Sequence, residues 1–148
     1  MPLDTPTNYA PHTGQTAELP VLDGLALSVG EHTMALITGA DRGKVISGAN
    51  TTGYRYTGFV SVQPVGPGNN LRATLVQAGT FWLPFDHVVL NTDHGDLVYL
   101  ADNEKLTLAS ALDPTPVFVV VGILRQAHLL NNTYGLVTLI PGLGAILA

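Results

Sequence analysis

The chain has 148 residues and a net charge of −5 at pH 7; 46% of its residues are hydrophobic and only 11% are charged. This composition excludes a chain that is disordered throughout, and the length suits one domain with an apolar core. Charged residues make up about 25% of an average soluble domain, so the deficit predicts a surface that is partly covered by a partner.

Charge distribution and hydropathy narrow the class of partner. The six basic residues are scattered along the chain, whereas nucleic-acid binding needs a concentrated basic patch, so no nucleic acid is expected. The longest apolar run, Val117–Leu124, ends at Arg125 and is too short for a membrane helix, so no membrane is expected. The first residues do not resemble a signal peptide. Without cysteine, disulfides and thiolate metal sites are impossible.

Residues 1–20 differ from the rest because they hold four of the ten prolines and only two charged residues. Proline at this density favours extended backbone, either as a loose tail or as an arm lying on a neighbouring subunit. We predict an arm over 1–20 and a single β-rich domain over 21–148. Leu3, Tyr9 and Leu19 are the candidate contacts of the arm. Deleting the arm is expected to weaken assembly while the β domain stays folded.

From residue 21 onward, short apolar runs are separated by glycine, proline and asparagine, which predicts an all-β fold, either a small barrel or a sandwich. No internal repeat is detected, and no window shows sustained helical periodicity. The predicted strands are Leu25–Val29, Thr33–Thr38, Lys44–Ser47, Tyr54–Gln63, Leu71–Gln77, Thr80–Leu83, His87–Leu90, Leu97–Ala101, Lys105–Leu108, Val117–Leu124 and Leu136–Ile140.

Two strands carry the clearest patterns. Over residues 54–62, Tyr54, Tyr56, Val60 and Val62 alternate with more polar residues, and Phe59 is the exception. This period of two predicts one buried face. The continuous apolar run over 117–121 predicts a strand that is buried on both faces.

The C-terminal residues 135–148 contain no charge. A strand over Leu136–Ile140 is followed by a Pro-Gly break and an apolar tail with Leu143 and Ile146 as its largest side chains. We predict that this tail packs either on its own domain or on a neighbouring subunit.

The strongest candidates for metal binding or catalysis lie between Asp86 and Asp96. Asp86-His87 and Asp93-His94 recur seven residues apart, and two imidazoles with three carboxylates could bind zinc or a hard metal. The alternative is that Asp93 and Asp96 shape the turn before the next strand. The spacing is not diagnostic of a metal site, and we predict neither a metal nor another cofactor.

Catalytic motifs are also missing. The sequence has no nucleophile elbow, no phosphate-binding glycine loop and no histidine pair of the jelly-roll dioxygenases. We therefore predict no catalytic residues and a non-enzymatic protein.

Trp82, the single tryptophan, lies in a run of bulky apolar residues over 79–85. Such a run could line a glycan or ligand site, belong to the core, or contact another subunit, where aromatic side chains contribute strongly to binding. All three interpretations remain open at this point.

The segment from residue 73 onward resembles the capsid decoration (cement) proteins of tailed bacteriophages. The matching elements, in order, are a strand that leads into Gly79–Pro84, then Gly95–Tyr99, Lys105–Leu108, Val121–Leu124 and Gly135–Pro141; residues 54–62 match more loosely. The chain departs from the family pattern over Leu124–Leu130, where smaller, alanine-rich loops are more usual.

The resemblance implies a virion protein on the outer capsid surface, with a small β-tulip-like fold. Such proteins bind the major capsid protein at threefold and quasi-threefold positions, as trimers or single copies, and stabilise the expanded head. We expect a homotrimer with Leu3, Tyr9, Leu19, Trp82, Leu143 and Ile146 at subunit or capsid contacts. The alternatives are a phage head-fibre or tail module that binds glycans through Trp82 and a small metal-dependent enzyme that uses His87 and His94.

Overall fold

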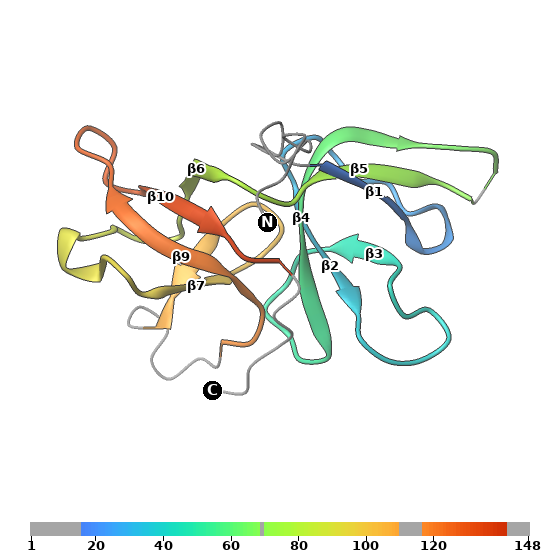
Figure 1. Cartoon of the computed structure of the whole chain (residues 1–148), viewed down its shortest axis with the longest axis horizontal. Helices are drawn as coiled ribbons and strands as arrows, with labels where there is room; N and C mark the ends of the chain where they lie inside the picture. Colours follow the sequence, from blue (N-terminus) through green and yellow to red (C-terminus); the bar gives the residue numbers. More distant parts are fainter. Residues whose placement is uncertain (1–15, 69, 110–116, 142–148) are drawn as a thin grey trace, which may run out of the picture.

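The computed structural model describes residues 16–68, 70–109 and 117–141, which form two antiparallel five-stranded sheets (Figure 1). The expected mainly-β fold is confirmed. Of the two predicted forms it is the sandwich-like one, because neither sheet closes into a barrel. Strand β4 of the first sheet lies nearest to the second sheet and contacts its strand β9.

The strands follow the same spatial order in both sheets. The first sheet has the order β1-β5-β4-β2-β3 and the second has the order β6-β10-β9-β7-β8. In the first sheet the strands are β1 (Thr16–Pro20), β2 (His32–Leu36), β3 (Val45–Ser47), β4 (Tyr54–Val65) and β5 (Arg72–Val76). In the second they are β6 (Thr80–Pro84), β7 (Leu97–Leu100), β8 (Leu106–Leu108), β9 (Val120–Ala127) and β10 (Tyr134–Leu139).

Each strand of the first sheet therefore has a counterpart five strands later in the chain. We call residues 16–76 repeat 1 and residues 80–139 repeat 2. A 3-10 helix follows the first strand in both repeats, η2 (Leu22–Gly24) and η3 (Asn91–Asp93). In both, the residue directly after the first strand forms a parallel bridge with the third strand, Val21 with Val45 and Phe85 with Leu106. The chain thus contains an internal structural repeat, which the sequence analysis did not detect.

The irregularities of the sheets are repeated as well. The register between the second and fourth strands shifts by one residue at Gly58 in repeat 1 and at Gly122 in repeat 2. A Cβ atom would lie 2.2 Å from the Val76 carbonyl oxygen at Gly58 and 2.0 Å from the Thr138 carbonyl oxygen at Gly122. Both bulges therefore require glycine. Equivalent strand pairs are Thr33–Gly58 and Val98–Gly122, and Met34–Tyr56 and Tyr99–Val120.

The core of each repeat is built from equivalent positions. Val21, Val45, Val60, Ala73 and Leu75 are buried in repeat 1. Their counterparts Phe85, Leu106, Leu124 and Val137 are buried in repeat 2, and Gly135 is the counterpart of Ala73. A Cβ at Gly135 would lie 2.8 Å from the Phe85 ring and 2.6 Å from the Leu124 side chain. The larger side chains of the second core are thus accommodated by a smaller residue at position 135.

Because of the bulge at Gly58, the burial pattern of β4 differs from the expected alternation. Tyr56 and Phe59 both pack towards repeat 2, whereas Val60 is in the core of repeat 1. The extra residue changes which side chains share a face, which explains why Phe59 broke the alternation. Val62, predicted on the buried face, is exposed because a second register shift follows Val60. The predicted burial of 117–121 is confirmed except at Phe118, which is partly exposed.

Two predicted strands are wrong, and one strand was not predicted. Leu25–Val29 and His87–Leu90 are irregular segments at equivalent places, between the first and second strands of each repeat. Each buries one apolar side chain, Leu27 or Val89. Conversely, Thr16–Pro20 within the predicted arm is strand β1, paired with β5 along its whole length.

Candidate interaction surface

The predicted contact residues fall into two groups. Leu3, Tyr9, Leu143 and Ile146 lie outside the described residues. Leu19 lies in β1 and packs against the core of its own repeat. Because β1 is paired within the sheet, Leu19 is part of the fold of repeat 1 and does not belong to a free arm.

Trp82 lies on β6 and its side chain is 43% exposed. Its ring packs edge-to-face against His128 at the end of β9, with ring centroids 4.8 Å apart and planes inclined by 72°. Neighbouring residues on β6 point the other way, because Phe81 and Leu83 pack into the core. Of the three interpretations, burial in the core is excluded for Trp82 itself, and a surface contact or ligand contact remains.

His128 also shapes the turn between β9 and β10. Its Nδ1 atom accepts hydrogen bonds from the backbone N–H groups of Leu130 and Asn131, at 3.1 and 3.0 Å. The side-chain oxygen of Asn131 accepts hydrogen bonds from the backbone and the hydroxyl of Thr133. These local bonds fix the turn without using the side chain of Leu129 or Leu130.

Leu129 and Leu130 consequently point into solvent, with 86% and 94% of their surface exposed. Together with Trp82 and His128 they form what we call the β9–β10 tip, which projects from one end of the molecule (Figure 1). Isolated exposed leucines are common, but two adjacent ones held on an ordered turn beside a half-exposed tryptophan indicate a contact surface.

The equivalent hairpin of repeat 1 also has an apolar end. Val62 and Val65 on β4 are 50% and 64% exposed. The turn after them is tight, because a Cβ at Gly66 would lie 2.1 Å from the Asn70 carbonyl oxygen. This β4–β5 tip projects from the end of the molecule opposite to the β9–β10 tip (Figure 1).

The described residues also form an open pocket of about 550 Å³, which is lined mainly by repeat 1 and, in addition, by Gln77 and by Pro141 after β10. Its apolar lining includes Leu19 and Ala35, and two guanidinium groups, those of Arg42 and Arg55, stand among its lining residues. The pocket combines an apolar interior with positive charge at exposed positions.

The predicted metal candidates do not converge. No group of three or more histidine or acidic side chains comes together among the described residues. His87 is hydrogen-bonded to its neighbour Asp86 at 2.6 Å. The carboxylate of Asp93 accepts a hydrogen bond from the backbone N–H of Leu90, so the turn-forming role predicted for Asp93 is confirmed.

Sequence reasoning missed most of this surface. The sequence marks Leu129 and Leu130 only as a departure from the pattern of the proteins it resembles, and the predicted alternation puts Val62 on the wrong face. Arg42 gave no signal, because a lone exposed arginine is ordinary. The sequence does contain a signal of the repeat. Thr-x-x-Leu-Pro occurs at 16–20 and again at 80–84, and the two bulge glycines, Gly58 and Gly122, are separated by the same number of residues.

We compared the chain with protein-family models, curated proteins and solved structures, and none of them matches it. Across the described parts of the chain, no helix has the length and apolarity needed to cross a membrane.

Proposed function

We propose that the protein is a non-enzymatic structural protein of a phage virion. It binds the outer surface of the capsid at threefold or quasi-threefold positions, contacts the major capsid protein, and stabilises the expanded head as a homotrimer. The observation that carries the proposal is the β9–β10 tip, an ordered turn that holds Leu129 and Leu130 in solvent.

A tip of this kind suits binding to another protein. Its apolar side chains lose contact with water on docking, and its pre-formed turn loses little conformational freedom. The single tryptophan beside the turn is of the residue type that contributes most to interfaces. The second apolar tip, at Val62 and Val65, gives the molecule a second contact of similar character.

Weak contacts of this size are sufficient on a repetitive shell. When several linked subunits bind one surface together, each further contact forms at a high effective concentration. A trimer with two tips in each subunit would therefore bind a capsid much more tightly than one tip binds one site.

The capsid is favoured as the partner by the order of the matching sequence elements. In the structure, Gly79–Pro84 contains β6, Gly95–Tyr99 enters β7, and Lys105–Leu108 contains β8. The last two elements fall on β9 and β10. The resemblance thus covers the five strands of repeat 2 in sequence, instead of scattered loops.

Co-sedimentation with capsids of the phage that encodes the protein tests this function. The double variant Leu129→Ser/Leu130→Ser should bind at least about tenfold more weakly, because roughly 1.4 kcal/mol of apolar contact corresponds to a tenfold change. Leu25→Ser/Val29→Ser, a pair of exposed apolar residues in repeat 1 that belong to neither tip, is the matched control and should bind normally. Equal binding by the tip variant and the wild type would contradict the proposal.

Glycan binding is the second candidate, and the exposure of Trp82 beside His128 is the observation that favours it. Aromatic side chains on an ordered surface can stack on sugar rings. A glycan array with the wild type and Trp82→Ala distinguishes the two functions, since a capsid-binding protein should give no glycan signal that depends on Trp82.

A further inference from the structure

The two repeats pack against each other through unlike faces. The face of repeat 1 that lies opposite its own core carries Met34, Tyr56 and Phe59, and all three pack into the cluster of repeat 2. The Phe59 ring meets the Phe81 ring of β6 edge-to-face, with centroids 5.2 Å apart. We call this side of repeat 1, and its equivalent in repeat 2, the outer face.

In repeat 2 the contact covers the open end of the second core. Leu83, Leu100 and Leu139 lie at this end and are buried in the cluster that repeat 1 joins. A Cβ at Gly48 of repeat 1 would lie 3.2 Å from the Leu100 side chain, so the two repeats are in direct contact there. We call this end of each repeat the mouth.

The mouth of repeat 1 is the open pocket. By strand register, Leu19, Ala35 and Gln77 occupy the positions that Leu83, Leu100 and Leu139 occupy in repeat 2. All three line the pocket of about 550 Å³. Among the residues that the structure describes, the place that repeat 1 fills in repeat 2 is therefore open in repeat 1.

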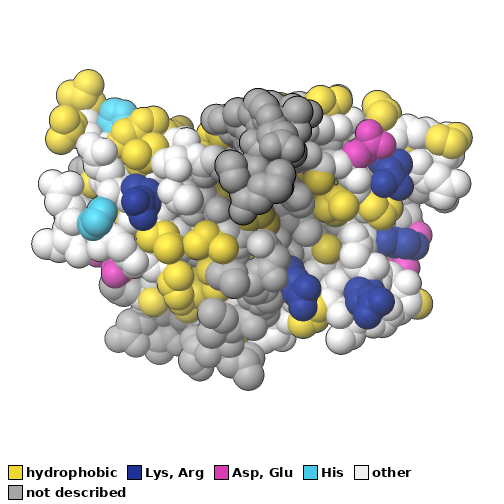
Figure 2. Space-filling model, viewed as in Figure 1, with side chains coloured by type: hydrophobic (Ala, Val, Ile, Leu, Met, Phe, Trp, Pro, Cys, Tyr) yellow, Lys and Arg dark blue, Asp and Glu magenta, His cyan; other side chains and the backbone are white. Residues whose placement is uncertain are grey.

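The outer face of repeat 2 is still partly available. Leu97 is equivalent to His32, and Ile123 is equivalent to Phe59. Leu97 is 39% exposed, and Ile123 is partly exposed. Figure 2 shows hydrophobic side chains gathered over β7 and β9, the strands that carry these residues. Tyr99 and Val120 on the same face are already buried with Val117, so Leu97 and Ile123 are the part left for a contact.

Polar groups at the edge of the contact match as well. Within the chain, Glu31 accepts a hydrogen bond of 2.9 Å from Asn103, which lies in the β7–β8 turn of repeat 2. The equivalent of Glu31 in repeat 2 is Asp96, and the equivalent β2–β3 loop of repeat 1 carries Arg42. Between two copies, the same arrangement would bring together opposite charges, which favours association.

We propose that a second copy of the chain places the outer face of its repeat 2, centred on Leu97, in the mouth of repeat 1. The contact reproduces between chains the one that repeat 1 makes with repeat 2 within a chain. This contact specifies how copies of the chain associate in the proposed function. It rests on the self-association in that proposal and not on capsid binding. Because the two faces differ, the contact is head-to-tail, and it forms a ring if the rotation closes and a filament if it does not. A closed trimer would arrange six repeats in one ring.

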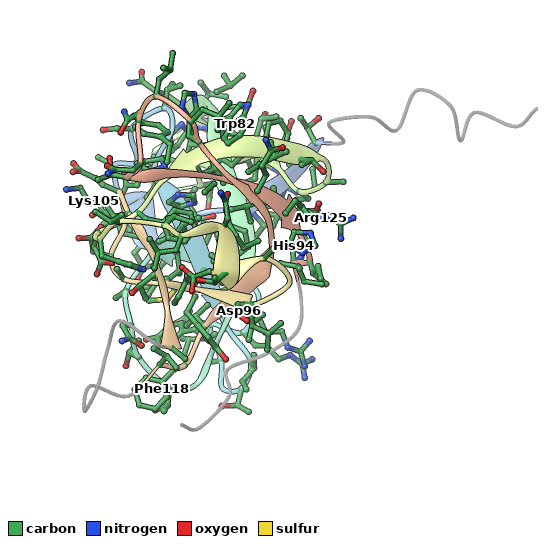
Figure 3. All side chains as sticks on the ribbon, turned by 90° about the vertical axis from the view of Figure 1, so that its left-hand side faces the viewer. Trp82, His94, Asp96, Lys105, Phe118 and Arg125 are labelled. Carbon is green, nitrogen blue, oxygen red and sulfur yellow. The ribbon has the colours of Figure 1, made fainter. Side chains whose placement is uncertain are left out.

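Sedimentation equilibrium of the full chain over a range of concentrations tests the contact. Wild type should self-associate, and Arg42→Asp or Asp96→Arg alone should weaken association by about tenfold or more, a change of about 1.4 kcal/mol. The double variant Arg42→Asp/Asp96→Arg should restore most of the loss. Because Arg42 and Asp96 are exposed, these variants should fold normally. Lys105→Glu is the control. Figure 3 places Lys105 on the side of repeat 2 opposite to His94 and Arg125, which are close in sequence to the contact residues Leu97 and Ile123.

Three results would overturn the inference: a wild type that is monomeric at every concentration, an assembly that both single variants leave unchanged, or a double variant that is as weak as the singles. Capsid binding, measured separately, distinguishes this inference from the proposed function. A monomer that still binds capsids rejects the head-to-tail contact only, whereas self-association without capsid binding rejects the capsid only.

Discussion

At the residue scale, His32 is the clearest case of a side chain whose chemistry is set by its surroundings. It is buried between the two repeats, with its Nδ1 atom 2.8 Å from the hydroxyl of Tyr56. Burial lowers the pKa of His32 to about 4, although the nearby charge of Asp102 acts in the opposite direction. Burial also raises the pKa of Tyr56 far above its usual value, so both groups are neutral in the folded protein near pH 7.

We predict that the free energy of unfolding falls as the pH drops from about 6.5 to about 4. In this window the unfolded chain binds a proton at His32 that the folded protein does not bind, so acid favours unfolding. The contribution is fully present above pH 6.5, and its loss amounts to roughly 3 kcal/mol at the lower end. Urea unfolding at several pH values measures the slope.

Variants of two histidines isolate this effect. His32→Gln, which cannot titrate, should lose most of the slope between pH 6.5 and 4, whereas His94→Gln at an exposed position should retain it.

The slope that remains at the acid end should include a contribution from Glu31. Burial raises the pKa of Glu31, but hydrogen bonds from Ser28, Ser47 and Asn103 outweigh burial and lower it overall. The stability from Glu31 is therefore present above its ordinary pKa and lost as the pH falls below it.

The bulge glycines give a second prediction at this scale. Gly58→Ala and Gly122→Ala should each destabilise the protein by roughly 2 kcal/mol or more, because the new Cβ would overlap a backbone carbonyl oxygen of the neighbouring strand. Gly95→Ala is the control: its φ is +90° but a Cβ there meets no atom within 4 Å, so only backbone strain of about 1 kcal/mol is expected. Chemical denaturation of the three variants gives the comparison. A loss at Gly122 no larger than at Gly95 would contradict the role of the second bulge.

At the scale of the elements, local pattern was sufficient where side chains alternate or form short β-branched runs. Val117–Leu124 and Thr80–Leu83 are examples, and they overlap strands β9 and β6 of the structure. The pattern failed where burial of one side chain imitated a strand, as with Leu27 and Val89 in the connections between strands. Strand pairs such as β1 with β5 and β6 with β10 join segments that are distant in the sequence, so neither the strand order nor the mouth of repeat 1 could be predicted from local periodicity.

Strand β1 shows why the expected effect of deleting the predicted arm must be revised. Removing residues 1–20 deletes a strand that pairs with β5 from Thr16 to Pro20, and it removes Leu19 from the core of repeat 1. This deletion should lower the free energy of unfolding by roughly 2 kcal/mol or more. Removing residues 1–15 leaves β1 intact and should leave stability unchanged. Thermal unfolding of both variants is the measurement, and equal melting temperatures would contradict the role of β1.

The shorter deletion also tests the arm. If residues 1–15 contact a neighbouring subunit or the capsid, their removal should weaken capsid binding or self-association without changing the melting temperature. Unchanged binding by this variant would reject the arm.

At the scale of the whole molecule, the duplication connects the fold to the proposed function. One five-stranded design occurs twice, with the same strand order, the same bulge glycines and apolar hairpin tips at opposite ends (Figure 1). A molecule with two similar tips is suited to a surface that itself repeats. In the proposed head-to-tail contact, the mouth of repeat 1 would receive the next copy of the chain.

The most direct test of the capsid proposal is the number of copies of this chain per major capsid protein in purified particles of the phage that encodes it. The proposal predicts a ratio near one, measured by quantitative mass spectrometry of intact particles. A few copies per particle would indicate a fibre or tail module, and absence from the particles would contradict a role in the virion.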